Sequence, residues 1–243
     1  TQPYLTQAAY RDGKGRLWFG LREQLVEYDH GRISKYVPRA NEARIHEIAQ
    51  VIEDSRGRLL AVDSYGLYEF VEPTDPQNGG KWGQLRLDLA PGQTLSCIAT
   101  YIGSLWLGSS QGLIKYEANR QSLYTAKQGL SEDLIISLNE DRDGNLWLGT
   151  SSRGVCKLSG VRVVSFTQAE GIPAQTINRV FEDKQRRIYA SFDSGAAVEI
   201  VGSSAKPIVP SSRLGNFKVF RVVQDRRSDW WVGTDSALFT FTG

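Results

Sequence analysis

The chain has 243 residues, of which 40% are hydrophobic and 23% are charged, and its formal net charge at pH 7 is +2. This size and composition predict a globular chain with a core of its own, and the near balance of charge does not favour nucleic acid or an anionic membrane as a partner. No apolar run approaches the roughly 20 residues that span a bilayer, and no signal-peptide pattern opens the sequence. The first residue is Thr and Met is absent, as we expect of a processed protein or a segment of a longer one.

A polar turn followed by Leu-Trp-x-Gly recurs along the chain. Residues 140–150 read EDRDGNLWLGT, and residues 11–21 read RDGKGRLWFGL. A repeat of about 42 residues with strand-like patterning is typical of a radial array of small sheets or of a solenoid. The equivalent positions are Trp18, Leu60, Trp106, Trp147, Tyr189 and Trp231, at intervals of 42, 46, 41, 42 and 42 residues. We expect one domain over residues 1–243, made of six repeats at about 1–37, 38–90, 91–126, 127–168, 169–210 and 211–243.

The six repeats differ in how well they keep the turn. In the first two it reads Asp12 to Gly15 and Asp54 to Gly57. The second repeat also holds a Gly- and Pro-rich insertion, Pro73 to Gly83, which contains Trp82; we expect a mobile rim loop or a contact point there. The weaker copies are Thr100 to Gly103, where Asp is lost, and Asp183 to Arg186 and Asp225 to Ser228, where Gly is lost.

The fourth repeat shows the module most clearly. Four apolar-rich runs of strand length occupy residues 134–140, 146–150, 155–158 and 161–166. Between the first two, Asp141 to Gly144 has the composition of a tight turn. Four antiparallel strands in about 42 residues make one blade of a β-propeller. We label these strands A to D from the axis outward, and the sequence predicts an all-β propeller.

The pattern of this module resembles the two-component regulator propeller repeat. Residues 135–150 followed by Gly154-Val155 match the family pattern closely, and residues 94–109 with Gly112-Leu113 match it less well. Gly129-Leu130-Ser131 reproduces the family lead-in. The resemblance implies an extracytoplasmic sensor region of a bacterial membrane receptor, with a histidine kinase or diguanylate cyclase output outside this chain.

The sixth repeat shows no D strand, because the sequence stops after the run that corresponds to strand C. An unpaired edge strand is a liability for a soluble protein. Either a six-bladed ring closes with one incomplete blade or the natural protein continues with further blades, and the longer arrays usual in the resembling family favour the second.

Strand A runs toward the Asp-Gly turn, so the A–B turns gather on one face and the B–C and D–A loops on the other. The loop face varies between repeats and is polar, which favours a ligand site there. The alternative is that these loops are polar because water surrounds them. The candidate ligand-binding residues are Arg22, His46, Asp63, Tyr65, Arg153, Gln175, Asp193 and Asp235.

The turn face carries basic side chains with aspartates between them, which predicts a solvated surface or a seat for another domain. Its cationic residues are Lys14, Arg56, Arg142, Lys184, Arg186, Arg187, Arg226 and Arg227. Residues 141–145 resemble the start of a calcium loop, but the twelfth place is Ser152 instead of Glu and the Gly comes two positions early. A structural turn is therefore favoured, and we expect no metal site.

The repeated tryptophans are each followed by glycine two residues later, which favours packing between blades over stacking on a sugar. Cys97 and Cys156 fall in different strands of neighbouring blades, so we expect buried free thiols and no disulfide. The two histidines, His30 and His46, fall on opposite faces. No catalytic motif is present, and we expect no catalytic residue and no cofactor.

The sequence as a whole predicts a non-catalytic sensor or ligand-binding module in the periplasm or outside the cell. We expect its partners to be a small molecule, with carbohydrates among the candidates, or a protein, together with neighbouring propeller or output domains; a homodimer could form through the receptor. Nucleic acid is not expected. Two alternatives stay open: an enzyme similar to streptogramin B (virginiamycin B) lyase, for which only His46 is a candidate histidine, and a protein-interaction scaffold.

Overall fold

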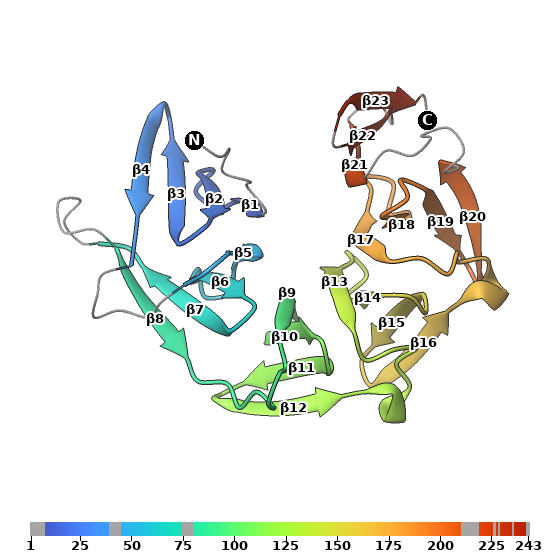
Figure 1. The fold of residues 1–243 in the computed structure, drawn as a ribbon, viewed down its shortest axis with the longest axis horizontal. Helices are drawn as coiled ribbons and strands as arrows, with labels where there is room; N and C mark the ends of the chain where they lie inside the picture. The colour runs from blue at the N-terminus through green and yellow to red at the C-terminus, as the bar shows by residue number, and fades with distance from the viewer. Residues whose placement is uncertain are drawn as a thin grey trace. The chain divides into compact units, whose positions relative to one another are not determined.

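The computed structural model describes residues 8–38, 45–73, 80–209, 219–225, 227, 229–234 and 236–241. These fall into two compact units, Thr1–Ser110 with Ile114–Leu123 and Gln111–Leu113 with Tyr124–Gly243. Every strand pairs in antiparallel fashion with the strand next to it in the sequence. The fold is all-β, as predicted, and its sheets are blades of a β-propeller (Figure 1).

Three sheets of four strands come from the first half of the chain. The first sheet contains β1 (Ala8–Arg11), β2 (Leu17–Leu21), β3 (Gln24–Asp29) and β4 (Arg32–Tyr36). The second contains β5 (Gln50–Glu53), β6 (Leu59–Asp63), β7 (Gly66–Val71) and β8 (Lys81–Leu85). The third contains β9 (Leu95–Tyr101), β10 (Ser104–Ser109), β11 (Gly112–Glu117) and β12 (Arg120–Tyr124).

Three more sheets follow in the second half. The fourth contains β13 (Ile135–Glu140), β14 (Leu146–Thr150), β15 (Val155–Ser159) and β16 (Arg162–Phe166). The fifth contains β17 (Ile177–Glu182), β18 (Ile188–Phe192), β19 (Ala197–Val201) and β20 (Ser204–Val209). The sixth contains β21 (Val219–Gln224), β22 (Trp230–Thr234) and β23 (Leu238–Phe241), so within the described residues it has three strands, as predicted.

The core lies between neighbouring sheets of each unit. In the second unit, one apolar cluster joins Trp147 and Val155 of the fourth sheet to Ile177 and Val180 of the fifth. Gly149 stands at this seam, and a Cβ placed on it would lie 2.6 Å from Ile177 Cγ2. In the first unit, a Cβ on Gly20 would lie 2.5 Å from Ile48 Cγ2. At these two positions, the glycine two residues after the tryptophan lets a side chain that leads into or lies in the next sheet approach closely.

Three of the four repeated tryptophans are core residues, as predicted: Trp18 is 0% exposed, and Trp106 and Trp147 are each 4% exposed. In the sixth sheet Trp231 is only half-buried, and its neighbour Trp230 is buried instead. Trp230 packs against Tyr189 and Phe181 of the fifth sheet. Adjacent residues of β22 face opposite sides of their sheet, so Trp230 faces the fifth sheet and Trp231 faces the other side.

Trp82 corrects the interpretation of the insertion. We expected Pro73 to Gly83 to be an insertion outside the blade pattern, but Trp82 lies in β8 and pairs with Phe70 of β7. Its side chain is 4% exposed, and its ring lies 5.0 Å from that of Phe70. The apolar stabilisation of this buried ring outweighs the Gly-rich composition around it. Residues 74–79, in the middle of the expected insertion, lie outside the described residues.

The two cysteines lie where they were expected. Cys97 is in β9 and Cys156 is in β15, and both are buried and free. Burial raises the pKa of the Cys97 thiol to about 12, so this thiol is protonated at neutral pH. In the described part of the chain, no helix is long and apolar enough to span a bilayer.

Candidate functional site

Four of the predicted ligand-binding residues meet on the loop face of the first unit, around Asp63. This carboxylate is fully buried. Its Oδ2 accepts a hydrogen bond from the His46 backbone N–H at 2.9 Å, and its Oδ1 accepts from the N–H groups of Tyr65 and Gly66 at 2.8 Å each. An antiparallel bridge between Arg22 and Glu47 brings the first sheet to the same place. Asp63 therefore fastens the segment that leads into β5 to the turn after β6.

An aromatic pair covers the buried carboxylate. The rings of His46 and Tyr65 lie 4.6 Å apart, and His46 Nδ1 is 3.5 Å from Asp63 Oδ2. Tyr65 is 62% exposed. Burial raises the pKa of Tyr68, and hydrogen bonding to Asp63 raises it further, so this phenol stays protonated and contributes to the support of Asp63. This group, His46 and Tyr65 over Asp63, forms a corner of the loop face with two solvent-facing rings above a buried, hydrogen-bonded carboxylate.

In the second unit, hydrogen bonds from its backbone N–H hold Arg153 in place. Its N–H donates to Glu132 Oε2 at 3.1 Å and to Thr150 Oγ1 at 3.2 Å. Glu132 also accepts from the backbone N–H and the hydroxyl of Ser152. These bonds hold the B–C loop of the fourth sheet against the segment that leads into β13, which fixes the point from which the Arg153 side chain extends.

A pocket of about 310 Å³ lies beside this loop. Ser152 and Arg153 form part of its wall, and Ile172 and Pro173, from the segment before β17, form another part. Its volume is at the lower end of the range of small-molecule sites. No acidic side chain lines it, and its lining residues are Ser131, Ser152, Arg153, Gly154, Ser165, Thr167, Gln168, Ile172, Pro173 and Ala174.

The remaining predicted ligand-binding residues do not gather around one pocket. Gln175 accepts a hydrogen bond from the Ser194 hydroxyl, and the Asp193 N–H donates to the Thr176 carbonyl at 3.1 Å. These contacts join the segment before β17 to the B–C loop of the fifth sheet, so Gln175 and Asp193 lie near each other but do not line the pocket beside Arg153. Asp235 lies outside the described residues.

On the turn face, the aspartates of the A–B turns have a recurring structural role. In the fourth sheet, Asp141 Oδ1 accepts from the N–H groups of Asp143 and Asn145, and its Oδ2 accepts from Trp147 Nε1 at 2.6 Å. Asp12 bonds Trp18 Nε1 at 2.9 Å in the same way, and Asp225 bonds Trp231 Nε1 at 3.0 Å. Each carboxylate thus joins its turn to the aromatic residue six positions later.

These bonds determine the charge state of the aspartates. Burial by itself raises the pKa of Asp141, but hydrogen bonds from Trp147 and Asn145 outweigh it and bring the pKa below its usual value. For Asp183 the opposing groups are the backbone and side chain of Arg187, with the same net lowering. The turn of residues 141–145 directs its carboxylate inward to nitrogen donors, and no group of three potential metal ligands occurs among the described residues.

The third sheet departs from this plan. We expected its turn to be Thr100 to Gly103 with Thr in the Asp position, but Thr100 pairs with Leu105 inside the hairpin, as Glu140 pairs with Leu146 in the fourth sheet. The loop itself is Ile102 and Gly103, with φ of 48° and 70°. A deletion of one residue therefore removed the aspartate position, and Trp106 Nε1 donates to the Tyr101 carbonyl instead, at 3.2 Å.

Glutamates at the end of strand A connect neighbouring turns. Glu53 Oε2 accepts from the Gly13 N–H at 2.7 Å, which links the first two sheets. Glu182 Oε2 accepts from the Arg142 N–H at 3.2 Å, which links the fourth and fifth. The equivalent position in the sixth sheet is Gln224, because it directly precedes the turn residue Asp225.

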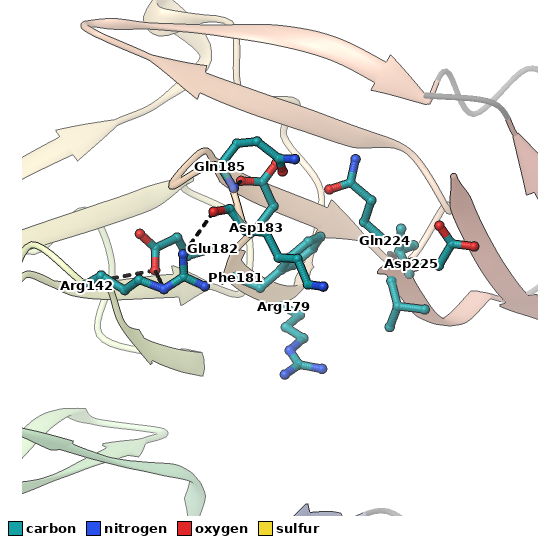
Figure 2. A pocket seen from close by; sticks show the side chains of 11 residues that line it. Arg142, Arg179, Phe181, Glu182, Asp183, Gln185, Gln224 and Asp225 are labelled. Carbon is teal, nitrogen blue, oxygen red and sulfur yellow. Dashed lines mark hydrogen bonds and ion pairs between the residues drawn. The ribbon is translucent and has the colours of Figure 1, made fainter. Parts of the chain in front are cut away.

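A second pocket, of about 400 Å³, opens on the turn face of the second unit. Figure 2 shows Arg142 and Glu182 at one side, Gln224 and Asp225 at the other, and Arg179 with Phe181 between them. The sequence predicted only a solvated or domain-binding surface here. The signal that we missed is Phe181, a large apolar side chain at the turn end of strand A, where the fourth sheet has Asn139.

The family comparison supports the repeat assignment. Residues 129–152 match the model of the family described as two component regulator propeller. These residues run from the Gly-Leu-Ser lead-in through β14 to the B–C loop that holds Arg153. No curated protein matches the chain significantly.

Solved structures share the fold. The extracellular domain of a putative hybrid two component system from B. thetaiotaomicron has a TM-score of 0.74 and 17% identity over 99% of this chain and 33% of its own. That of a putative one component system from the same organism has a TM-score of 0.77 and 18% identity over 100% of this chain and 35% of its own. This chain spans about a third of the length of those domains.

A propeller enzyme has a similar fold. Virginiamycin B lyase from Staphylococcus aureus, in a catalytically inactive form with quinupristin, has a TM-score of 0.71 and 11% identity over 100% of this chain and 85% of its own. At such identities the likeness concerns the fold alone. The resemblance predicted from the repeats is confirmed: residues 129–152 match the two component regulator propeller model, in a chain with the β-propeller fold.

Proposed function

We propose that this chain is a non-catalytic sensor module of a bacterial signal-transduction receptor, on the extracytoplasmic side of the membrane, and that its ligand binds on the loop face. The family match of residues 129–152 and the fold shared with extracellular domains of two component and one component systems support this role. The catalytic output, either a kinase or a cyclase, belongs to another part of the receptor.

The observation that carries the proposal is the pocket beside Arg153. Its walls come from two neighbouring sheets, with Ser152 and Arg153 after β14 and Ile172 to Ala174 before β17. A ligand there contacts both sheets at once. If it binds with different affinity in two arrangements of the receptor, that difference in free energy is sufficient to shift the receptor between them.

The lining favours a polar ligand with an apolar side. Three serines and Thr167 place hydroxyl groups around the pocket, Arg153 supplies a cation, and Ile172 with Pro173 supplies apolar surface. The Thr167 hydroxyl already bonds Glu170 at 2.9 Å. Sugars combine hydroxyl groups with apolar ring faces, so we place carbohydrates first among the candidates. The second corner, His46 and Tyr65 over Asp63, presents exposed rings of the kind on which a sugar stacks.

The test is binding of neutral oligosaccharides to the purified chain, measured by saturation-transfer NMR. We expect at least one sugar of a broad panel to bind, and Arg153→Ala to weaken it about tenfold, as loss of a hydrogen bond from a charged group does. Lys206→Gln, an exposed substitution on β20, is the matched control and leaves binding unchanged. The proposal fails if no sugar binds and receptor signalling persists after residues 151–153 and 172–174 are replaced.

Two other functions have less support. A lyase of the streptogramin B type is favoured only by the fold shared with virginiamycin B lyase. Magnesium-dependent turnover of a streptogramin B that His46→Ala abolishes would establish it in place of the sensor. A scaffold that only joins proteins would bind no small molecule on either face, so the sugar panel separates it from a sensor as well.

A further inference from the structure

The turn-face pocket of the second unit has an aromatic floor held in place by packing. Phe181 stacks on Tyr189 with ring centroids 5.5 Å apart and meets Trp230 edge-on at 6.0 Å. Tyr189 and Trp230 are buried and contact each other at 4.7 Å. Val223 of β21 adds apolar surface to the lining. Because these rings are already fixed, a planar apolar group can bind against Phe181 with little loss of protein entropy.

Each acidic side chain of this pocket accepts hydrogen bonds from within the protein. Asp183 accepts from Gln185 N, from Arg187 N and Nε, and from the Tyr189 hydroxyl. Asp225 accepts from the N–H groups of Arg227 and Asp229 and from Trp231 Nε1. Glu182 accepts from the Arg142 backbone and pairs with its side chain at 3.6 Å. Asp183 and Asp225 therefore have little capacity left for a ligand that brings donors, and Glu182 is engaged through Oε2.

The basic side chains keep donors to spare. The Arg142 side chain is 50% exposed, and its only hydrogen bond among the described residues goes from Nη1 to the Lys184 carbonyl at 3.1 Å. Lys184 is exposed, and it forms no ion pair within the described part of the chain. An arginine carries five N–H donors and a lysine three. The lining has three cations and three carboxylates. The carboxylates are engaged within the protein, whereas Arg142 and Lys184 keep unused donors beside the apolar floor.

We propose that this pocket binds a small carboxylate with a planar, apolar body, stacked on Phe181 with its anionic group toward Arg142 and Lys184. The volume of about 400 Å³ accommodates a molecule of that size. The site lies on the turn face, opposite the loop face, and does not depend on the sensor ligand proposed above. A second ligand site on this face would give the module a second input.

Benzoate and its neutral isostere benzamide test the proposal, by titration of the 243-residue chain followed by two-dimensional NMR. We expect benzoate to shift the resonances of β17 and β21 and to bind about tenfold more tightly than benzamide, because only the carboxylate meets the cations. Raising the salt concentration should weaken the binding of benzoate and leave the binding of benzamide unchanged.

Three variants test which side chains bind the carboxylate and which binds the ring. Lys184→Gln and Arg142→Gln should each weaken benzoate about three- to fivefold without affecting benzamide, since each removes one charge at a partly exposed site. Phe181→Leu should weaken both ligands by a similar factor, because it removes the stacking surface and keeps an apolar side chain. Lys206→Gln is the charge-matched control on β20 and should change neither.

Three outcomes would overturn the assignment: benzoate that binds no better than benzamide, benzoate affinity unchanged in both charge variants, and shifts that map to the loop face. Circular dichroism of each variant shows whether it has folded. The sugar experiment on the loop face is independent, so a failure here leaves the proposed sensor function in place, and the reverse also holds.

Discussion

The A–B turns of the third and fourth sheets support a buried tryptophan by different means. In the fourth, Asp141 accepts a hydrogen bond from Trp147 Nε1 at 2.6 Å, and in the third, the Tyr101 carbonyl accepts one from Trp106 Nε1 at 3.2 Å. Both rings are 4% exposed. The indole N–H must be satisfied wherever the ring is buried, but the acceptor depends on the length of the loop.

The difference in length also determines the strain. A five-residue turn leaves room for a carboxylate that bonds two backbone N–H groups, whereas the two-residue loop places Ile102 at φ 48°. Positive φ is unfavourable for a β-branched residue. The third sheet therefore has a simpler turn that is more strained locally, and the fourth has a more extensive network that depends on one carboxylate. The three experiments below test this contrast.

Removal of the carboxylate should have the largest effect. Asp141→Ala leaves the N–H groups of Asp143, Asn145 and Trp147 without their acceptor, and we expect a loss of about 3 kcal/mol in the free energy of unfolding. Urea denaturation measures it. Thr100→Ala in the third sheet is the matched control and should cost less than about 1 kcal/mol, because the Tyr101 carbonyl still accepts from Trp106. Equal losses in the two sheets would contradict the assigned role of Asp141.

Relief of the strained loop should give the next largest effect, in the opposite direction. Asn tolerates positive φ, so Ile102→Asn should stabilise the protein by about 1 kcal/mol. Val161→Asn is the control, since Val161 is also an exposed hairpin residue, at 98%, but does not have positive φ. If both substitutions change the urea midpoint alike, the gain comes from surface polarity and the strain argument is wrong.

The smallest effect is expected on the loss of stability at acidic pH. The pKa of Asp141 is lower in the folded protein than its ordinary value, because hydrogen bonds outweigh burial. Its contribution to stability is complete above the unfolded pKa of about 3.9 and is lost as the pH falls through the folded pKa. Asp141→Asn should therefore flatten the decline of stability below about pH 5. Urea midpoints at several pH values, compared with those of Thr100→Ala, measure this change; a parallel decline in both variants would exclude the linkage.

Much of the architecture could be predicted from the repeat. Period, turn residues and the Trp-x-Gly pairs located the hairpins and the packing between sheets, because strand spacing and glycine have local physical consequences. Three local details were wrong: Trp82 is a core residue of β8, the third turn is one residue shorter than its composition suggested, and Trp231 is only half-buried. These errors concern strand pairing and the packing between sheets, which residue type alone does not show.

The candidate sites were only partly predictable. Polar composition singled out Asp63 and Arg153 as candidate ligand-binding residues, but it did not indicate that Asp63 is buried as a support for His46 and Tyr65. The hydrogen-bond partners that give these residues their roles are far apart in the sequence: His46 and Asp63 are separated by 17 positions, and Arg142 and Glu182 by 40. No local pattern reports such distances. The pocket floor at Phe181 was not predicted for the same reason.

The sequence by itself determined that this protein consists of repeated antiparallel blades, since each repeat carries its own turns and its own apolar face. The tertiary structure decided which polar residues hold the fold and which remain for a ligand. In the sequence, an aspartate in a turn and an arginine in a loop are both simply polar residues between two strands. Their roles differ because the donors and acceptors supplied by neighbouring sheets engage the first and leave the second partly available.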